Sequence, residues 1–479
     1  MLVFHIDFNT EALTRDTVLS MLRFAASCGY DAVLWEVEDK IQWECCPECV
    51  SQDAFSKEEF REILAEAKAL GLMPIPLMQT FGHGEYILSH SEYFKWRELP
   101  DKKDCYCVSN PEVRKFLKGF LHEYLELFGD DVRYFHLGGD EAYSFGKCPI
   151  CSNRNRMELY GEHLREVASE LIERNIRPGC WCDMILSGDE DEAVKHIPTD
   201  FVIWHWDYRY GTASNSVSKW SDKTDFLKSH GYDVVFCAAA ESHGDDPFLP
   251  KYRFHEANIA ASAALARQEG FLGLCVTSWS IRGVSKVAQY PLFELAARCY
   301  SDQELDPSQE FKRCVRSFFG DITPDTLYRL SDWNNFYLFE GRSWNVYKDA
   351  MPPMVGQFDY ILGRNVAHTP GFPEAAIADL SQQLTATQQA IDEVRNASFK
   401  LAAADILIEA ATLRAALLKT LIDVLKTGRH KGVPFAATVA YYAKEKTDWS
   451  AANMARTVWG ILDERYAVPF DPTQLFKPR

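Results

Sequence analysis

Eight short apolar runs, separated by longer amphipathic stretches, occupy the first 300 residues of this 479-residue chain. Parallel strands need long crossover connections, so this alternation is typical of a parallel sheet covered by helices. The number of runs, and the absence of a glycine-rich nucleotide loop after the first, favour a closed (β/α)8 TIM barrel over a doubly wound open sheet. The expected strands are Leu2–Phe8, Ala32–Val37, Met73–Met78, Tyr134–Leu137, Arg177–Cys182, Phe201–Trp206, Asp233–Cys237 and Leu272–Ser278.

The segments between these runs have apolar residues three and four positions apart, as in helices with one buried face. Beyond about residue 304 the alternation gives way to long stretches rich in Ala, Leu, Glu and Lys. We therefore expect an α/β barrel over residues 1–304 and an α-helical C-terminal domain over residues 305–479. The expected helices are Thr14–Ser27, Lys57–Leu70, Pro111–Phe128, Leu159–Arg174, Ala257–Gln268, Pro291–Tyr300, Val315–Phe319, Leu327–Phe336, Ala375–Val394, Lys400–Leu425 and Ala451–Arg465, with an irregular stretch at 351–373.

The formal net charge of −18 limits the classes of partner. Nucleic acids and anionic membrane surfaces are bound by clustered Lys and Arg, so neither is expected here. No apolar run reaches the roughly 20 residues that a membrane-spanning helix needs. The N-terminus has neither the basic start nor the long apolar run of a signal peptide, which predicts a cytoplasmic location.

Carboxylates and aromatic side chains gather just after the expected strands. In a barrel these positions share one rim, where active sites lie. Carboxylates bind sugar hydroxyls, and tryptophan faces stack on the C–H face of a pyranose. A single such acid is often a helix cap, and a single tryptophan is more often core, so the hypothesis of a carbohydrate site rests on their concentration. The residues are Glu36, Glu38, Asp39, Trp43, His83, Asp140, Glu141, Trp181, Asp183, Trp204, Trp206, Asp207, Tyr208, Trp279 and Arg282.

The segment His136-Leu-Gly-Gly-Asp-Glu141 is the most specific of these elements. Its two glycines allow a tight backbone path and close approach of a ligand. In an extended chain, neighbouring side chains point in different directions. Asp140 and Glu141 therefore do not resemble two opposed acids that clamp a glycosidic bond. They suit a division of roles, in which one acid with a raised pKa protonates the leaving oxygen and the other stays ionised.

This segment resembles the active-site signature of glycoside hydrolase family 20, the β-N-acetylhexosaminidases, and the strand order of residues 1–300 is similar too. The resemblance implies an exo-acting enzyme that releases terminal β-linked N-acetylglucosamine or N-acetylgalactosamine. It implies a retaining, substrate-assisted mechanism through an oxazolinium intermediate, with no catalytic cofactor. Asp140 would orient the acetamido nitrogen, and Glu141 would be the general acid and then the general base.

Other residues match the family position by position. His83 would couple to the acid, with Asp39 (or Glu38) behind it. Three tryptophans would enclose the acetamido pocket, and Tyr208 would donate to the acetamido oxygen. Trp204 competes with Trp206 for its place, because alternation along a strand puts both on one face. The three tryptophans of the pocket are Trp181, Trp206 and Trp279.

The chain also departs from the family. Asp7-Phe-Asn9 stands where many members have an arginine for the sugar's 3- and 4-hydroxyls, and Ala238–Asp246 replaces a Trp-Tyr-x-Asp element. Glu241, Asp245 and Arg282 are candidates for those contacts.

Two other functions stay open from the sequence. One is a retaining glycosidase of another class, with Glu241 or Asp183 as an enzymic nucleophile. The other is a non-catalytic sugar-binding barrel. A homodimer is one expectation for the assembly, with the C-terminal helices packed on a second subunit.

Two Cys-x-x-Cys pairs follow the second and fourth expected strands. Four thiolates from two such pairs suit tetrahedral zinc, so we expect a structural Zn²⁺ at this rim. Free buried thiols and redox-active pairs are the alternatives, and Cys45, Cys105 and Cys107 are further thiols nearby. The expected ligands are Cys46, Cys49, Cys148 and Cys151.

Overall fold

A computed structural model of the chain describes residues 1–186, 190–212, 223–242, 245–280, 283–332, 372–427 and 432–466. Its strands are parallel and close into one barrel in chain order, which confirms the (β/α)8 TIM fold. The strands are β1 Leu2–Asp7, β2 Ala32–Glu36, β3 Met73–Leu77, β4 Tyr134–His136, β5 Arg177–Trp181, β6 Val202–Trp206, β7 Asp233–Glu241 and β8 Gly273–Ser278.

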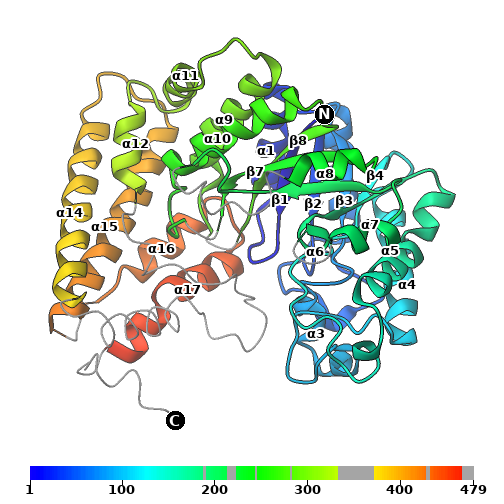
Figure 1. Cartoon of the computed structure of the whole chain (residues 1–479). Helices are drawn as coiled ribbons and strands as arrows, with labels where there is room; N and C mark the ends of the chain where they lie inside the picture. The colour runs from blue at the N-terminus through cyan, green and yellow to red at the C-terminus, as the bar shows by residue number, and fades with distance from the viewer. Residues whose placement is uncertain are drawn as a thin grey trace. The chain divides into compact units, whose positions relative to one another are not determined.

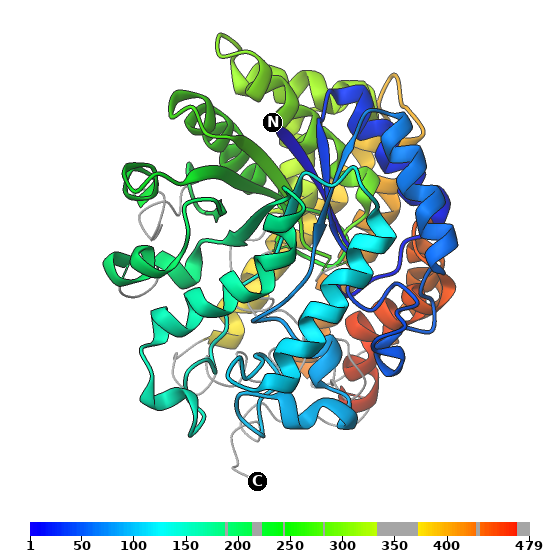
Figure 2. The ribbon, with the colours of Figure 1, turned by 90° about the vertical axis from the view of Figure 1, so that its right-hand side faces the viewer.

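Helices connect successive strands and lie outside them (Figure 2). Local capping residues define where several of them begin. A reciprocal capping box between Ser56 and Glu59 starts α2, while Asn110 and Asn155 cap α4 and α5; such caps satisfy the free N–H groups of a first turn. The longer helices are α1 Arg15–Cys28, α2 Lys57–Ala69, α4 Pro111–Phe128, α5 Arg156–Glu173, α9 Tyr252–Gln268 and α10 Lys286–Ser301. The shorter ones are α3 Glu85–Leu88, α6 Asp183–Leu186, α7 Glu190–His196 and α8 Thr224–Ser229.

By its contacts the chain divides into two compact units. The first comprises residues 1–9, 18–238 and 260–277, and the second comprises residues 10–17, 239–259 and 278–479. The second unit therefore combines the C-terminal region with two loops and the ends of β7 and β8. The boundary expected at residue 304 stays a prediction.

Beyond residue 304 the described elements are all helices, as expected. Helices α14 and α15 lie side by side (Figure 1). The expected helix over Leu327–Phe336 begins earlier, and positions 333–336 and most of the expected irregular stretch lie outside the described residues. None of the described helices is both long and apolar enough to cross a membrane. The helices are α11 Pro307–Phe319, α12 Pro324–Ser331, α14 Phe372–Arg395, α15 Ala403–Thr427, α16 Phe435–Tyr442 and α17 Asp448–Tyr466.

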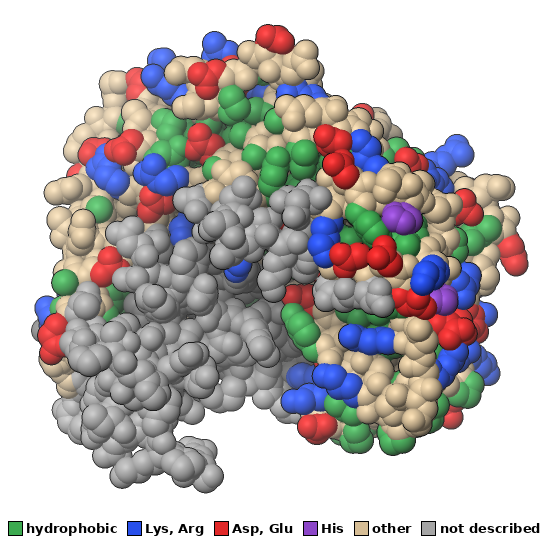
Figure 3. All heavy atoms as spheres, viewed as in Figure 1, with side chains coloured by type: hydrophobic (Ala, Val, Ile, Leu, Met, Phe, Trp, Pro, Cys, Tyr) green, Lys and Arg blue, Asp and Glu red, His purple; other side chains and the backbone are tan. Residues whose placement is uncertain are grey.

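Acidic and basic side chains are interspersed over the described surface of the face shown in Figure 3. Hydrophobic side chains lie between them in small groups. Charged side chains of both signs thus separate the hydrophobic groups on this face. The homodimer expected from the sequence stays a prediction.

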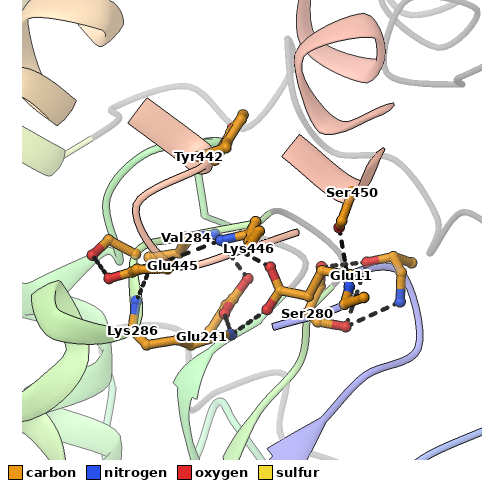
Figure 4. Close-up of polar contacts among 12 residues, drawn as sticks. Glu11, Glu241, Ser280, Val284, Lys286, Tyr442, Glu445, Lys446 and Ser450 are labelled. Atoms are coloured by element: carbon orange, nitrogen blue, oxygen red, sulfur yellow. Dashed lines mark hydrogen bonds and ion pairs between the residues drawn. The ribbon is translucent and has the colours of Figure 1, made fainter. Parts of the chain in front are cut away.

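A buried network of charges holds together distant segments of the second unit (Figure 4). Lys286 Nζ lies 2.7 Å from Glu11 Oε1 and 3.1 Å from Glu241 Oε2. Lys446 Nζ lies 3.0 Å from the other oxygen of Glu11. All four side chains are at most 3% exposed. The network therefore joins the β1–α1 loop, the end of β7, α10 and the α16–α17 connection.

The pKa values of these groups follow from burial and pairing. Burial alone would lower the pKa of Lys286, but Glu11 and Glu241 outweigh it and raise that pKa above its ordinary value. Burial also opposes ionisation of Glu11, yet its two lysines keep the pKa of Glu11 below its ordinary value. Burial raises the pKa of Glu241 to about 7. The two lysines are thus the cations that make this acidic cluster tolerable in the interior.

Removal of Lys286 should therefore destabilise the protein. We predict that Lys286→Met lowers the free energy of unfolding by about 3 kcal/mol or more, because it leaves buried acids without their cation. Denaturant unfolding followed by circular dichroism measures this change. The matched control is Lys444→Met, which removes the surface pair with Glu409 and should change stability by less than about 1 kcal/mol. Equal effects of the two variants would contradict the prediction.

Candidate active site

The backbone is strained at three places on the rim of the barrel. Glu38, His83 and Glu141 have φ values of +39°, +50° and +46°, although none is glycine. They follow β2, β3 and β4, respectively. Such conformations cost about 1–3 kcal/mol each and persist where surrounding structure enforces them, most often at functional sites. The strain marks the loops after β2, β3 and β4 as the candidate site.

Glycines allow the loops after β3 and β4 to approach each other. A Cβ at Gly82 would lie 1.9 Å from the carbonyl oxygen of Asp140, and one at Gly138 would lie 2.1 Å from Gln79 Oε1. Gly138 and Gly139 also have positive φ values of +66° and +96°. The tight path expected from the two glycines is therefore present, and it brings the acidic pair against the His83 loop.

The two neighbouring acids converge on one histidine nitrogen. His83 Nε2 lies 3.2 Å from Asp140 Oδ2 and 3.5 Å from Glu141 Oε2. The Tyr143 hydroxyl donates to Glu141 Oε1 at 2.7 Å. The expectation that adjacent acids diverge is wrong here, because it assumed an extended chain, whereas Glu141 has positive φ.

The position of His83 between two carboxylates determines its charge. Burial alone would lower the pKa of the imidazole, but Asp140 and Glu141 outweigh it and raise that pKa well above its ordinary value. The two acids thus favour the protonated form of the ring. The Asp140 side chain is 9% exposed and that of Glu141 is 35% exposed, so Glu141 is the acid that is more open to a ligand.

A third acid, Asp183 at the start of α6, supports the strained turn. Its Oδ2 accepts the Glu141 backbone N–H at 2.8 Å. Burial, followed by the nearby charge of Asp140, raises the pKa of Asp183 to about 8. Burial similarly raises the pKa of Glu36, which accepts from Gln79 Nε2 at 2.8 Å, to about 7. At neutral pH Asp183 is thus mostly protonated and Glu36 about half protonated, while Glu141 is partly exposed to solvent.

The structure separates the tryptophans into buried and accessible groups. Trp181 and Trp204 are fully buried, and each packs against His136. Trp206 is only partly buried, and its ring stacks on Tyr208 with centroids 5.6 Å apart and an angle of 21° between the planes. Of the two residues that competed for one role, Trp206 is therefore the better placed to meet a ligand.

Two other expected residues lie in different surroundings. Asp39 Oδ1 lies 2.5 Å from Lys40 Nζ, and its expected role behind His83 stays a prediction. Trp279 follows β8 in the second unit, where its backbone N–H donates to the backbone carbonyl of Glu241 at 3.3 Å. The binding role of Trp279 stays a prediction, and Arg282 lies outside the described residues.

The cysteines form a different cluster from the expected one. Cys148 Sγ and Cys151 Sγ lie 3.7 Å and 3.9 Å from Cys107 Sγ. Glu98 completes this group, with all four donor atoms within 4.8 Å of one another. Cys46 lies beside Cys45 instead, with their sulfurs 3.9 Å apart. The expected ligand set of Cys46, Cys49, Cys148 and Cys151 is thus corrected, because the second pair meets the β3–α4 connection.

Three residues of these clusters escaped assignment from the sequence. Tyr143 lies two positions after Glu141, but a tyrosine in a loop carries no recognisable pattern. Glu98 has no pattern either, since its function depends on burial. Cys107 was noted in the sequence only as a further thiol. The 40 residues between it and Cys148 are too many to predict a contact without the fold.

The fold and the rim together define a TIM-barrel protein with an acid pair and aromatic residues at the carboxyl ends of its strands. Residues 34–280, more than half of the chain, match the family described as "Glycosyl hydrolase family 20, catalytic domain". The chain therefore belongs to glycoside hydrolase family 20. Both the barrel and the resemblance of the Asp140–Glu141 segment agree with this membership.

Individual relatives are more distant. The chain is 28% identical over 190 residues to Hexosaminidase D of Bos taurus (38% of this chain, 55% of that one). It is 31% identical over 193 residues to Hexosaminidase D of Homo sapiens (38% and 39%). The matches thus span less than two thirds of these relatives. The crystal structure of β-N-acetylhexosaminidase from Bacteroides fragilis NCTC 9343 has a similar fold, with a TM-score of 0.52 and 18% identity over 66% of this chain and 69% of that one.

The raised pKa of Asp183 predicts a dependence of stability on pH. Because its folded pKa of about 8 exceeds the ordinary value of 3.8, its protonated form stabilises the fold at low pH, and this contribution is lost as pH rises through about 8. Asp183→Asn keeps an acceptor for the Glu141 N–H but cannot ionise. We predict that unfolding free energy falls less between about pH 5 and pH 8.5 in this variant than in the parent.

Denaturant unfolding at the two pH values provides the measurement. The control is Asp191→Asn in α7, which changes an exposed acid and should leave the pH profile as it is in the parent. If Asp183→Asn had the same profile as the parent, Asp183 would not be the buried group that ionises.

Proposed function

We propose that this protein is an exo-acting β-N-acetylhexosaminidase, which releases terminal β-linked N-acetylglucosamine or N-acetylgalactosamine from oligosaccharides or glycosides. The observation that supports this most directly is the convergence of Asp140 and Glu141 on His83 at the rim of a family 20 barrel. A strained turn and a buried third acid hold this pair in place.

In the first step, the substrate's acetamido oxygen attacks the anomeric carbon while the bond to the leaving oxygen breaks. Glu141 donates its proton to that oxygen, and its partial exposure suits contact with the leaving group. Asp140 accepts a hydrogen bond from the acetamido N–H and balances the positive charge of the oxazolinium that forms.

In the second step, a water molecule attacks the anomeric carbon from the side that the leaving group vacated. Glu141, now ionised, takes a proton from this water, and the bond to the acetamido oxygen breaks. Two inversions give overall retention of configuration. His83 lies against both acids, and the Tyr143 hydroxyl donates to Glu141 Oε1, so both would hold the pair in position. The reaction uses no metal.

The stacked Trp206 and Tyr208 are the side chains that we propose to meet the N-acetyl group. Trp206 would pack on its methyl group, and the Tyr208 hydroxyl would donate to its oxygen. Trp181 is fully buried, so it would support the pocket from the interior of the barrel and not contact solvent.

A separate enzymic nucleophile has less support. Asp183 is buried, and its Oδ2 accepts the backbone N–H of Glu141. With a pKa of about 8, its carboxyl group is largely protonated at neutral pH. A protonated carboxyl group is a poor nucleophile. Glu241 is fully buried, and its Oε2 is engaged by Lys286 and by Gln289 Nε2 at 2.9 Å. Neither acid is arranged to attack a sugar.

Substrate requirement tests the proposed reaction. We predict release of p-nitrophenol from the aryl N-acetyl-β-glucosaminide or galactosaminide, because the acetamido group supplies the nucleophile. The matching β-glucoside and β-galactoside should react at least about 100-fold more slowly. A thiazoline mimic of the oxazolinium should inhibit competitively. Rapid hydrolysis of the plain glycosides would instead favour an enzymic nucleophile.

The role of Glu141 has its own test. Glu141→Gln should lower kcat/KM by about 10²–10⁴-fold on a substrate with a poor leaving group, and less on a nitrophenyl substrate whose leaving group needs little protonation. Glu158→Gln makes the same change at an exposed position of α5 and should leave both rates unaltered. Equal losses on the two substrates would contradict the assignment of the acid.

A further inference from the structure

A cluster of three thiols and one carboxylate joins the loops that follow β3 and β4. Glu98 and Cys107 lie between β3 and α4, and Cys148 and Cys151 lie between β4 and α5. All four residues are buried, with exposures of 2%, 6%, 7% and 1%. The cluster lies apart from the proposed chemistry, which does not use any of these side chains.

The spacing of the donor atoms fits a tetrahedral ion. A Zn–S bond of about 2.3 Å places two sulfurs on a tetrahedron about 3.8 Å apart, and a Zn–O bond of about 2.1 Å places sulfur and oxygen about 3.6 Å apart. The observed distances are 3.7 Å and 3.9 Å between Cys107 Sγ and the other two sulfurs. Glu98 Oε2 lies 3.5 Å from Cys151 Sγ. These separations are far longer than a disulfide bond.

Glu98 provides an independent observation. Its side chain is almost fully buried, and among the described residues no lysine or arginine forms an ion pair with it. A buried carboxylate without a cation is unfavourable. Its Oε1 accepts the Cys148 N–H at 3.0 Å, which leaves Oε2 directed at the sulfurs. A divalent cation among the four donors would supply the missing positive charge.

Hydrogen-bond donors around the cluster also suit thiolates. The Cys151 N–H points at Cys148 Sγ at 3.3 Å, and the Ser109 hydroxyl oxygen lies 3.1 Å from Cys151 Sγ. Three thiolates, one carboxylate and a divalent ion carry a net charge of −2, so donors of this kind favour the bound state. Each thiol would release its proton to solvent when the ion binds.

We propose that Glu98, Cys107, Cys148 and Cys151 form a structural Zn²⁺ site that ties the β4–α5 connection to the β3–α4 connection. Soft sulfur donors in tetrahedral arrangement select zinc over magnesium or calcium. Four protein ligands leave no open position, so the ion is structural and not catalytic. The Asp104 carboxylate reinforces the same junction, since it accepts from the Ser144 N–H at 2.9 Å and from the Ser144 hydroxyl at 2.7 Å.

The test is the zinc content of the full chain, expressed with ample zinc and purified with a reductant but without chelator. Inductively coupled plasma mass spectrometry should find about one equivalent, and X-ray absorption should fit three sulfurs and one oxygen. Less than about 0.3 equivalents, or a shell of four sulfurs, would overturn the proposal. Both readouts are independent of enzymatic activity.

Matched variants locate the ion. Cys148→Ser/Cys151→Ser should lose the metal, whereas Cys46→Ser/Cys49→Ser, which alters the other Cys-x-x-Cys pair, should keep about one equivalent. Loss from the second variant with retention in the first would overturn the assignment. Glu98→Gln tests the oxygen ligand with a smaller change, and should lower zinc affinity by at least about 10-fold in competition with a chromogenic chelator. Unchanged affinity would remove Glu98 from the site.

Discussion

Closure of eight parallel strands into one barrel is the constraint on which the candidate site depends. Every parallel strand ends at the same rim, so loops far apart in the sequence become neighbours. The loops after β3 and β4 meet in this way, with Gly82 against the Asp140 carbonyl and His83 against both acids. The β5 end adds Asp183, whose Oδ2 accepts the Glu141 backbone N–H. The chemistry proposed for the acid pair requires this convergence.

Buried acids recur in the protein, and each group is stabilised by a different arrangement. In the first unit, Asp140 and Glu141 lie against His83 and raise its pKa, while burial leaves Asp183 largely protonated at neutral pH. In the second unit, Lys286 and Lys446 neutralise Glu11 and Glu241. An uncompensated charge in the interior is so unfavourable that each acid either gains a cation or keeps a proton. For Glu98, we propose that the cation is a metal ion.

Most of the barrel follows from local pattern. The expected strands agree with β1 to β6 and β8 to within one residue at each end, because each is a short apolar run bounded by turn residues. β7 extends to Glu241, four residues beyond the expected end. The sequence did not predict this extension because alanine has a weak preference for strands; burial in the sheet makes Ala238-Ala-Ala part of the strand. The short helices α3 and α6 contain four residues each, which is too few for the helical spacing of apolar residues to be recognised in the sequence. Helix α10 begins at Lys286 and contains Pro291, the residue at which the sequence suggested its start.

By itself, the sequence determined the barrel, the Asp140–Glu141 pair, His83 and the family, because these depend on periodicity and on a contiguous motif. Tertiary structure decided which side chains meet. It directed Glu141 toward His83 through a positive φ, and it joined Cys148 and Cys151 to Cys107 and Glu98 and not to Cys46 and Cys49. The physical reason is that these contacts depend on loop geometry and burial, which arise from packing between residues 40 or more positions apart. No local pattern in the chain encodes such distances.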